Sequence, residues 1–263
     1  MEKSGTEESE VKKNGDGGKL GIIGIIIYLL SSVPLFLSAE GDRFQFCVLK
    51  HGGVFNPHPT AYENIVKFLN STTSIDPTQE EIAFVAVSDE IFKYPFLYLA
   101  AKGRMPDFSK ADIALIARHL RSGGFLFIDE TDDYGAGDFK ESLEKFFREI
   151  FPDLKIEKIP QDDVIFKAFY LKPKASGRID RSPFLYGLNL DGRWAAVVSG
   201  NDIAGAWARD DLGRFLYDCS PGGEPQRMEA IKLTVNIIMY SLTGTYKQDI
   251  IHEKFIEMKL RSW

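Results

Sequence analysis

Four carboxylates gather where an apolar run of the sequence ends, and they are the residues best suited to chemistry. The run spans residues 124–128, and the acidic residues that follow it are Asp129, Glu130, Asp132 and Asp133. Converging carboxylates could hold Mg²⁺ or Ca²⁺, which prefer oxygen ligands. They could also raise one another's pKa, so that one of them serves as a general acid. The simpler alternative is a solvated loop that caps the next helix, so no cofactor or metal is assigned.

Other apolar runs also end in glycines or polar residues. Asp89 and Asp202 each follow such a run, and Trp207 comes shortly after the second. Trp207 is either a platform on which a sugar ring could stack or a core tryptophan. If the runs are parallel strands, their carboxyl ends lie at one edge of the sheet, where such folds bind ligands. We therefore expect a ligand-binding cleft lined by Gly52, Gly53, Asp89, Asp129, Glu130, Asp132, Asn201, Asp202 and Trp207.

Histidine and cysteine give little support to metal or nucleophilic chemistry. His51 and His58 stand at the two ends of the first of these loops, and they either face the cleft or are surface and capping groups. No two histidines have the spacing of a zinc site. Cys47 lies in an apolar run and is expected to be buried, whereas Cys219 lies in a loop. Neither stands in a G-x-C-x-G elbow and no G-x-S-x-G is present, so the sequence does not indicate amidotransferase chemistry.

Short apolar runs alternate with amphipathic segments, which predicts an α/β fold with a mainly parallel central sheet. Strands are predicted over residues 44–49, 82–87, 124–128, 154–159 and 194–199, and helices over 56–70, 109–122, 139–150 and 231–242. Residues 91–101 are predicted to be a packed connecting segment, because Pro95 would interrupt a helix there. Residues 173–190 are expected to form a loop with a turn or hairpin.

The N-terminal part of the chain predicts a membrane or export segment. Residues 1–19 are polar and expected to be disordered, whereas residues 20–39 carry no charge. A helix of that length just spans a hydrocarbon core of about 30 Å. Segment 20–39 is therefore an uncleaved transmembrane anchor or a signal peptide. Lysines precede it and acidic residues follow it, which places the α/β domain on the periplasmic or extracytoplasmic side.

Composition and charge limit the kinds of partner. The chain is 44% hydrophobic and 27% charged, which is typical of a globular protein. Its net charge is −6 and its basic residues are scattered rather than gathered in a stripe, so no nucleic-acid partner is expected. We predict one α/β domain over residues 42–247. A C-terminal amphipathic helix or tail follows over 248–263.

Several motifs of this domain resemble those of a bacterial family called domain of unknown function 4159. They are HGGxFNPHP from His51, IFKYPFLY, LRSGGFLFIDE, GNDIAGAW and the closing VNIIMYSLTGTYKQD. The resemblance implies a flavodoxin-like three-layer sandwich of the class I glutamine-amidotransferase-like kind, close to the trehalose-utilisation-like group. It also implies an envelope setting and brings no established activity. Where it leads us to expect Gly-His-Gly, this chain has Ala101-Lys102-Gly103.

Together these features favour an envelope-associated α/β domain that serves as a non-catalytic ligand-binding or assembly module. Its partners would be the membrane, through residues 20–39, and other envelope proteins. The alternative is a hydrolase or lyase whose acidic, metal-binding cleft acts on a small polar, sugar-like substrate.

Overall fold

The computed structural model divides the chain into two units, residues 1–42 and 43–263. It describes residues 44–73, 75, 82–132, 137–171 and 173–261, with side chains as far as residue 243. The predicted membrane or export segment, 20–39, lies outside the described residues. None of the described helices has an apolar stretch long enough for a bilayer.

A seven-stranded, mostly parallel sheet runs through the second unit. Its strand order is β2-β1-β3-β4-β7-β6-β5, and β6 runs antiparallel to both of its neighbours, β5 and β7. The strands are β1 (Cys47–Lys50), β2 (Ala83–Ala86), β3 (Phe96–Ala101), β4 (Phe125–Glu130), β5 (Ile156–Lys158), β6 (Tyr186–Leu190) and β7 (Arg193–Ser199). The predicted α/β class with a mainly parallel sheet is confirmed.

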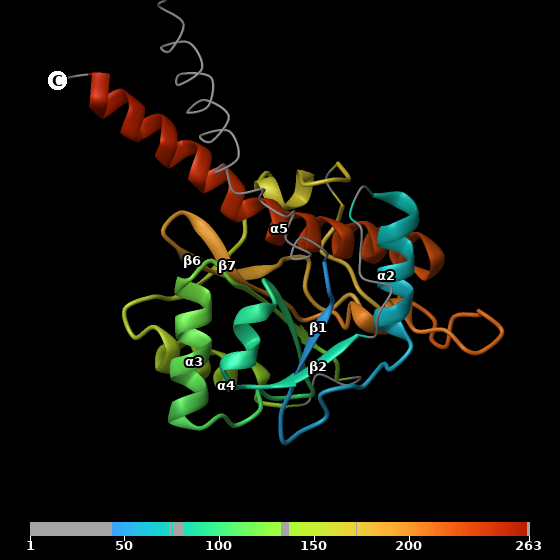
Figure 1. Ribbon diagram of the computed structural model, residues 1–263. Helices are drawn as coiled ribbons and strands as arrows, with labels where there is room; N and C mark the ends of the chain where they lie inside the picture. The colour runs from blue at the N-terminus through green and yellow to red at the C-terminus, as the bar shows by residue number, and fades with distance from the viewer. Residues whose placement is uncertain (1–43, 74, 76–81, 133–136, 172, 262–263) are drawn as a thin grey trace, which may run out of the picture. The chain divides into compact units, whose positions relative to one another are not determined.

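Helices cover both faces of the sheet, which gives three layers (Figure 1). The helices are α2 (Ala61–Thr72), α3 (Lys110–Arg121), α4 (Phe139–Ile150) and α5 (Gly223–Arg261), with 3₁₀ turns η1 (Asp89–Lys93), η2 (Val164–Lys167) and η3 (Ala204–Trp207). Helices α2 and α5 share one core with Phe46 and Tyr98, while α3 and α4 share the other with Leu49 and Leu99. Because strand side chains point alternately to opposite faces, each central strand contributes to both cores.

The prediction of a connecting segment over residues 91–101 is wrong. That stretch contains the end of η1 and then β3, whose six residues are all buried between β1 and β4. Pro95 stands just before the strand, where its missing N–H costs no ladder bond, and its carbonyl accepts a hydrogen bond from Phe125 N. Proline therefore marks the start of a central strand here rather than an irregular connection.

A hairpin joins β6 to β7. A loop with a turn or hairpin was expected for residues 173–190, where its first strand lies. Its turn residues, Asp191 and Gly192, have φ values of 53° and 86°. Two consecutive positive φ values are typical of the type I′ turn, and Asp-Gly is a favoured pair for it. The hairpin explains why β6 runs antiparallel to β7, the last of the parallel strands.

Helix α3 is capped at both ends, and its C-terminal cap sets where strand β4 begins. Ser109 and Asp112 form a capping box at its start. At its end Gly123 adopts a φ of 97°, and Gly124 N donates to His119 O at 3.0 Å. These contacts lead directly into β4.

Adding a methyl group at Gly124 is expected to destabilise the domain. The new Cβ would lie 2.1 Å from Nε2 of His119, which is 3% exposed and cannot move into solvent. We expect Gly124→Ala to lower the free energy of unfolding by about 1–3 kcal/mol, because overpacking of a core costs that much. Urea denaturation followed by tryptophan fluorescence measures the change. Gly52→Ala, which meets no heavy atom within 4 Å, is the control and should change it by less than about 0.5 kcal/mol.

Candidate functional site

The carboxyl ends of β1 and β3 form the topological switch point of the sheet. After β1 the chain crosses to β2 on one side of the sheet, and after β3 it crosses to β4 on the other side. In open α/β sheets, ligands bind in the crevice at such a point. His51 follows β1 and Lys102 follows β3, so both residues lie at this point.

An open pocket occupies the switch point. It has a volume of about 460 Å³, within the range common for small-molecule sites. It is lined by His51, Gly52, Gly53, Val54, Lys102, Arg104, Met105, Pro106 and Asp107. Two of the predicted cleft residues, Gly52 and Gly53, therefore line a real pocket.

His51 is neutral, and its imidazole ring holds one wall of this pocket in place. Its Nε2 lies 2.9 Å from the carbonyl oxygen of Ala100, and its Nδ1 accepts a hydrogen bond from Gly53 N at 3.0 Å. Because a carbonyl only accepts, the Nε2 atom carries the proton. Burial lowers the pKa of His51, in keeping with a neutral ring. The imidazole thus ties the glycine loop to the end of β3 without adding charge.

Two basic side chains and one acidic side chain also line the pocket: Lys102, Arg104 and Asp107. Lys102 is exposed and has no ion pair or hydrogen bond with any residue that the structure describes. Arg104 lies 3.8 Å from both Asp107 and Asp138, and these pairs are solvent-exposed. Exposed pairs at such distances contribute little to stability. The lining of this pocket therefore has one more cation than anion, and the carboxyl group of Asp132 lies beside it, 3.8 Å from the side-chain position of Gly103.

Asp129 and Asp202, two of the predicted cleft residues, are internal rather than cleft-lining. Asp129 is fully buried at the end of β4. Its carboxylate accepts hydrogen bonds from Ile203 N at 3.0 Å and Ala204 N at 2.9 Å, and Tyr98 donates to it at 3.2 Å. Burial, together with the nearby charge of Asp202, raises the pKa of Asp129 to about 7. Asp129 therefore fastens the start of η3 to the central sheet.

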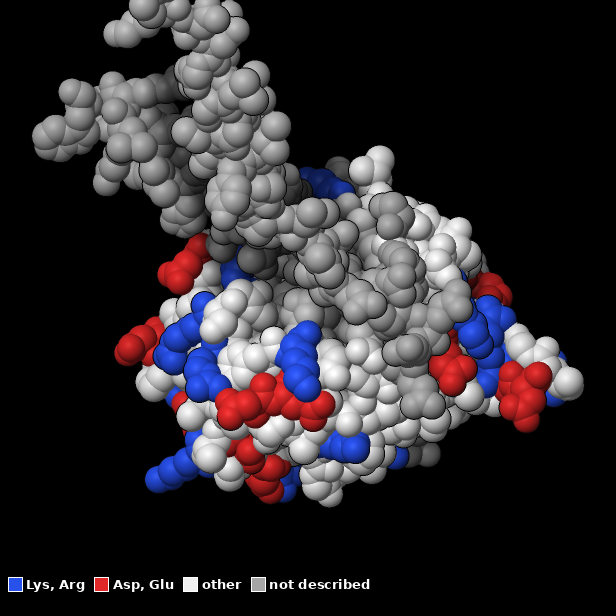
Figure 2. All heavy atoms as spheres, in the orientation of Figure 1, with Lys and Arg blue, Asp and Glu red and all other residues white. Residues whose placement is uncertain are grey.

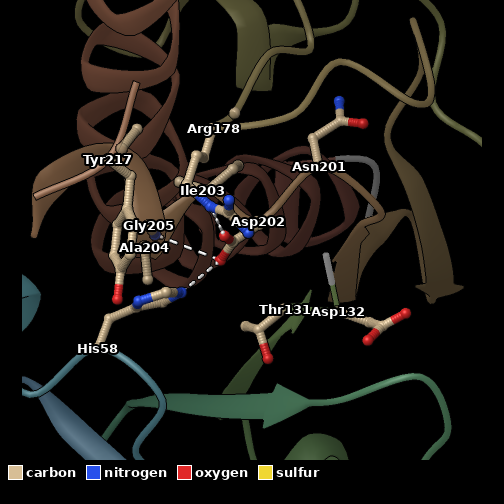
Figure 3. A network of polar contacts seen from close by, with 12 residues as sticks. His58, Thr131, Asp132, Arg178, Asn201, Asp202, Ile203, Ala204, Gly205 and Tyr217 are labelled. Atoms are coloured by element: carbon tan, nitrogen blue, oxygen red, sulfur yellow. Dashed lines mark hydrogen bonds and ion pairs between the residues drawn. The ribbon is translucent and has the colours of Figure 1, made fainter. Parts of the chain in front are cut away.

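Asp202 is the centre of a buried polar network (Figure 3). Its Oδ1 lies 2.8 Å from His58 Nε2, and its Oδ2 accepts a hydrogen bond from Arg178 Nε. The Arg178 guanidinium and the His58 ring each lie against the ring of Tyr217, at 5.1 Å and 5.3 Å. Asp202 has a φ of 53°, an uncommon conformation for a residue other than glycine. The network joins the loop before α2 to the turn after β7.

Two neighbouring polar residues, Asn201 and Glu130, also form internal contacts. Asn201 is fully buried, and its side chain bonds to the backbone of residues 175, 181 and 182. Glu130 is 8% exposed and lies 3.4 Å from Arg181 Nη1. Burial raises the pKa of Glu130, and the charge of Arg181 acts in the opposite direction. Arg181 also donates to the carbonyl of Asp132, so these residues hold the strand ends together.

Two other predicted site residues lie away from any common cleft. Asp89 follows the edge strand β2, and its 85% exposed side chain pairs with Arg118. Strands β1 and β3 separate β2 from β4, so Asp89 does not join Asp129 as expected. Trp207 is 2% exposed, and its Nε1 donates to Thr234, so its ring offers no face for a sugar. The core alternative is the one that the structure shows.

The acidic residues also lack the geometry of a metal centre within the described part of the chain. No group of three or more His, Cys, Asp or Glu side chains there could hold a metal ion. Asp133, one of the suggested oxygen ligands, lies outside the described residues. Asp129 uses both carboxylate oxygens for internal hydrogen bonds, which leaves it poorly suited to bind a cation.

The sequence interpretation misplaced one residue of these two regions and did not assign a role to two others. His58 was expected at the surface or in the cleft but is 6% exposed and bound to Asp202. Arg178 belongs to a stretch predicted as a loop, and no local motif points to its partner. Lys102 was hidden because β3 was not predicted to be a strand. The apolar run of six residues before it was the signal that could have placed Lys102 at a strand end.

These observations define a three-layer α/β domain with an open pocket at its switch point and a buried polar network centred on Asp202. The chain belongs to the family described as a domain of unknown function (DUF4159), whose sequence pattern matches residues 45–242. The resemblance seen in the motifs is thereby confirmed at the level of the family. No curated protein matches the chain significantly.

Proposed function

We propose that this chain is a non-catalytic ligand-binding or assembly module displayed at the cell envelope. The observation that carries the binding role is the open pocket at the switch point, between the loops that follow β1 and β3. Its walls are preformed, because His51 bonds to the end of β3 and to the loop that follows β1. A preformed pocket binds with less loss of conformational entropy than a loop that must order around its ligand.

The alternative, a hydrolase or lyase with an acidic cleft, has less support. Such an enzyme needs carboxylates that reach the substrate, but Asp129 and Asp202 are both fully buried. The thiols give no better nucleophile. Burial raises the pKa of Cys47 to about 12 and also raises the pKa of Cys219, so neither is poised as a thiolate.

The envelope setting rests on the sequence of residues 20–39, twenty residues without a charge. A domain held there would meet other envelope proteins, which is the assembly role that we propose. Kinship with class I glutamine-amidotransferase-like and trehalose-utilisation-like proteins is part of the same proposal. The order β2-β1-β3-β4, with a further parallel strand beyond it, supports this kinship because flavodoxin-like sheets share that order.

Thermal denaturation of the full chain in detergent, with Mg²⁺, Ca²⁺, small sugars and small anions, tests the binding role. A ligand at a hundred times its Kd should raise the Tm by about 5–10 °C. Val54→Trp should abolish that shift, because Val54 lines the pocket and its side chain is half exposed. The control is Val164→Trp, at an exposed position outside the pocket, which should leave the shift intact.

The same experiment can reject the proposal. A shift that survives Val54→Trp and disappears with Asp129→Asn would instead support the acidic-site enzyme. A protein that responds to no ligand class would contradict the ligand-binding role.

A further inference from the structure

The cations at the switch point set the charge of the ligand that this pocket can take. Of the lining residues, Lys102 and Arg104 are cationic and only Asp107 is anionic. Asp107 lies on the Arg104 side, 3.8 Å from that guanidinium. Lys102, by contrast, has no ion pair with any residue that the structure describes. A cation at a concave site attracts ligands of opposite charge.

The backbone around Lys102 lets a ligand come close. Gly103, with a φ of 70°, turns the chain directly after Lys102, and Gly52 has no heavy atom within 4 Å of a side-chain position. The His51 ring, which also lines the pocket, donates its proton to Ala100 O and accepts a hydrogen bond from Gly53 N. It therefore contributes neither a negative charge nor a free acceptor that would repel an anion.

The apolar part of the pocket suggests that the ligand is more than a bare ion. Val54 and Met105 also line it, and a volume of about 460 Å³ exceeds the space that one phosphate group needs. Ligand pockets commonly combine such an apolar wall with a few charged groups that fix orientation.

Resting on the proposed ligand-binding function, we propose that the pocket takes a small organic molecule bearing a phosphate or carboxylate group, held by Lys102. The oxyanion lies against the Lys102 ammonium, and Arg104 adds a second positive charge at the rim. The organic part of the molecule lies along Val54 and Met105.

Calorimetric titration of the full chain in detergent with glucose 6-phosphate, succinate and glucose tests this assignment at one ionic strength. We expect the two anions to bind and glucose to bind at least tenfold more weakly. Lys102→Gln should weaken anion binding at least tenfold without changing the Tm of the free protein, because its side chain is exposed. Lys102→Arg should restore most of the affinity. Added NaCl should weaken binding of the anions, since salt screens exposed charges.

The control is Lys50→Gln, which removes an exposed lysine at the end of β1 that does not line the pocket. It should leave the affinities within twofold of the unmodified chain. Equal affinity for glucose and glucose 6-phosphate, unaffected by Lys102→Gln, would overturn the anion assignment while leaving the ligand-binding function standing. Failure of both anions to bind would also overturn it, and loss of every ligand response in the wider screen would remove the function as well.

Discussion

Replacement of Asp202 by alanine is expected to lower the free energy of unfolding by about 3–5 kcal/mol. Asp202 is fully buried and faces both His58 and the guanidinium of Arg178, whose side chain is 11% exposed. Without the carboxylate, the arginine charge would stay largely buried with its partner gone, which is the costly way to break a buried pair. Since a domain of this size is stable by about 5–15 kcal/mol, the loss is large. Urea denaturation followed by tryptophan fluorescence measures it.

A second variant separates the charge from the backbone conformation. Asparagine tolerates positive φ better than alanine does, so Asp202→Asn keeps the backbone at 53° while it removes the charge and replaces one acceptor oxygen by an NH2 donor. We expect it to cost less than the alanine variant. The matched control is Asp89→Ala, which removes an 85% exposed carboxylate from its pair with Arg118 and should cost less than about 1 kcal/mol. Equal effects at the two positions would show that the network around Asp202 contributes little to stability.

The contrast between Asp202 and Asp89 also shows what the sequence could and could not predict. Both residues follow apolar runs, and local pattern alone gives them the same expected role. Their difference depends on strand order, because β2 is an edge strand whereas β7 lies beside β4. Order in a sheet is set by long-range packing and is not encoded in the spacing of apolar residues.

Elements with a strong local cause were predicted well. Helix α3 has its capping box at Ser109 and a terminal Gly123, and both cause and outcome lie within a few residues. The strand of residues 96–101 was missed, since Pro95 was given the weight that it would have inside a helix. Proline blocks a helix interior but is acceptable at the first position of a strand, so the same residue carries two meanings.

The chemistry of the site was less predictable than the fold. A run of carboxylates is compatible with a cleft, a metal site or internal hydrogen bonding, and only burial distinguishes these. The backbone N–H groups that Asp129 satisfies come from residues 203 and 204, more than seventy positions away. The pocket itself depends on loops after β1 and β3 meeting in space, which required both strands to be recognised.

Stability is expected to fall as pH rises through the titration of Asp129. In the unfolded chain this carboxyl has its ordinary pKa of 3.8, whereas in the folded protein burial and the nearby Asp202 raise it to about 7. Between these values the folded state holds one proton that the unfolded state has lost. The stabilisation is therefore fully present below about pH 4 and is lost as the pH approaches 7, by up to about 4 kcal/mol.

Comparison with Asp129→Asn isolates this contribution, because the amide does not titrate. The variant has its own constant cost, since one face of the amide would oppose a backbone N–H that the carboxylate now accepts. The difference in unfolding free energy between the unmodified chain and the variant should shrink steadily from pH 4.5 to pH 7.5. Denaturation in urea at several pH values gives this difference directly.

The neighbouring charge offers a further check on the cause. Because Asp202 helps to raise the pKa of Asp129, Asp202→Asn should move the titration of Asp129 to lower pH, while burial keeps it above 3.8. Infrared detection of the protonated carboxyl group follows that titration without unfolding the protein. If the difference between the unmodified chain and Asp129→Asn instead grows with pH, the backbone N–H groups of Ile203 and Ala204 outweigh burial. Asp129 is then a charged anchor rather than a protonated one.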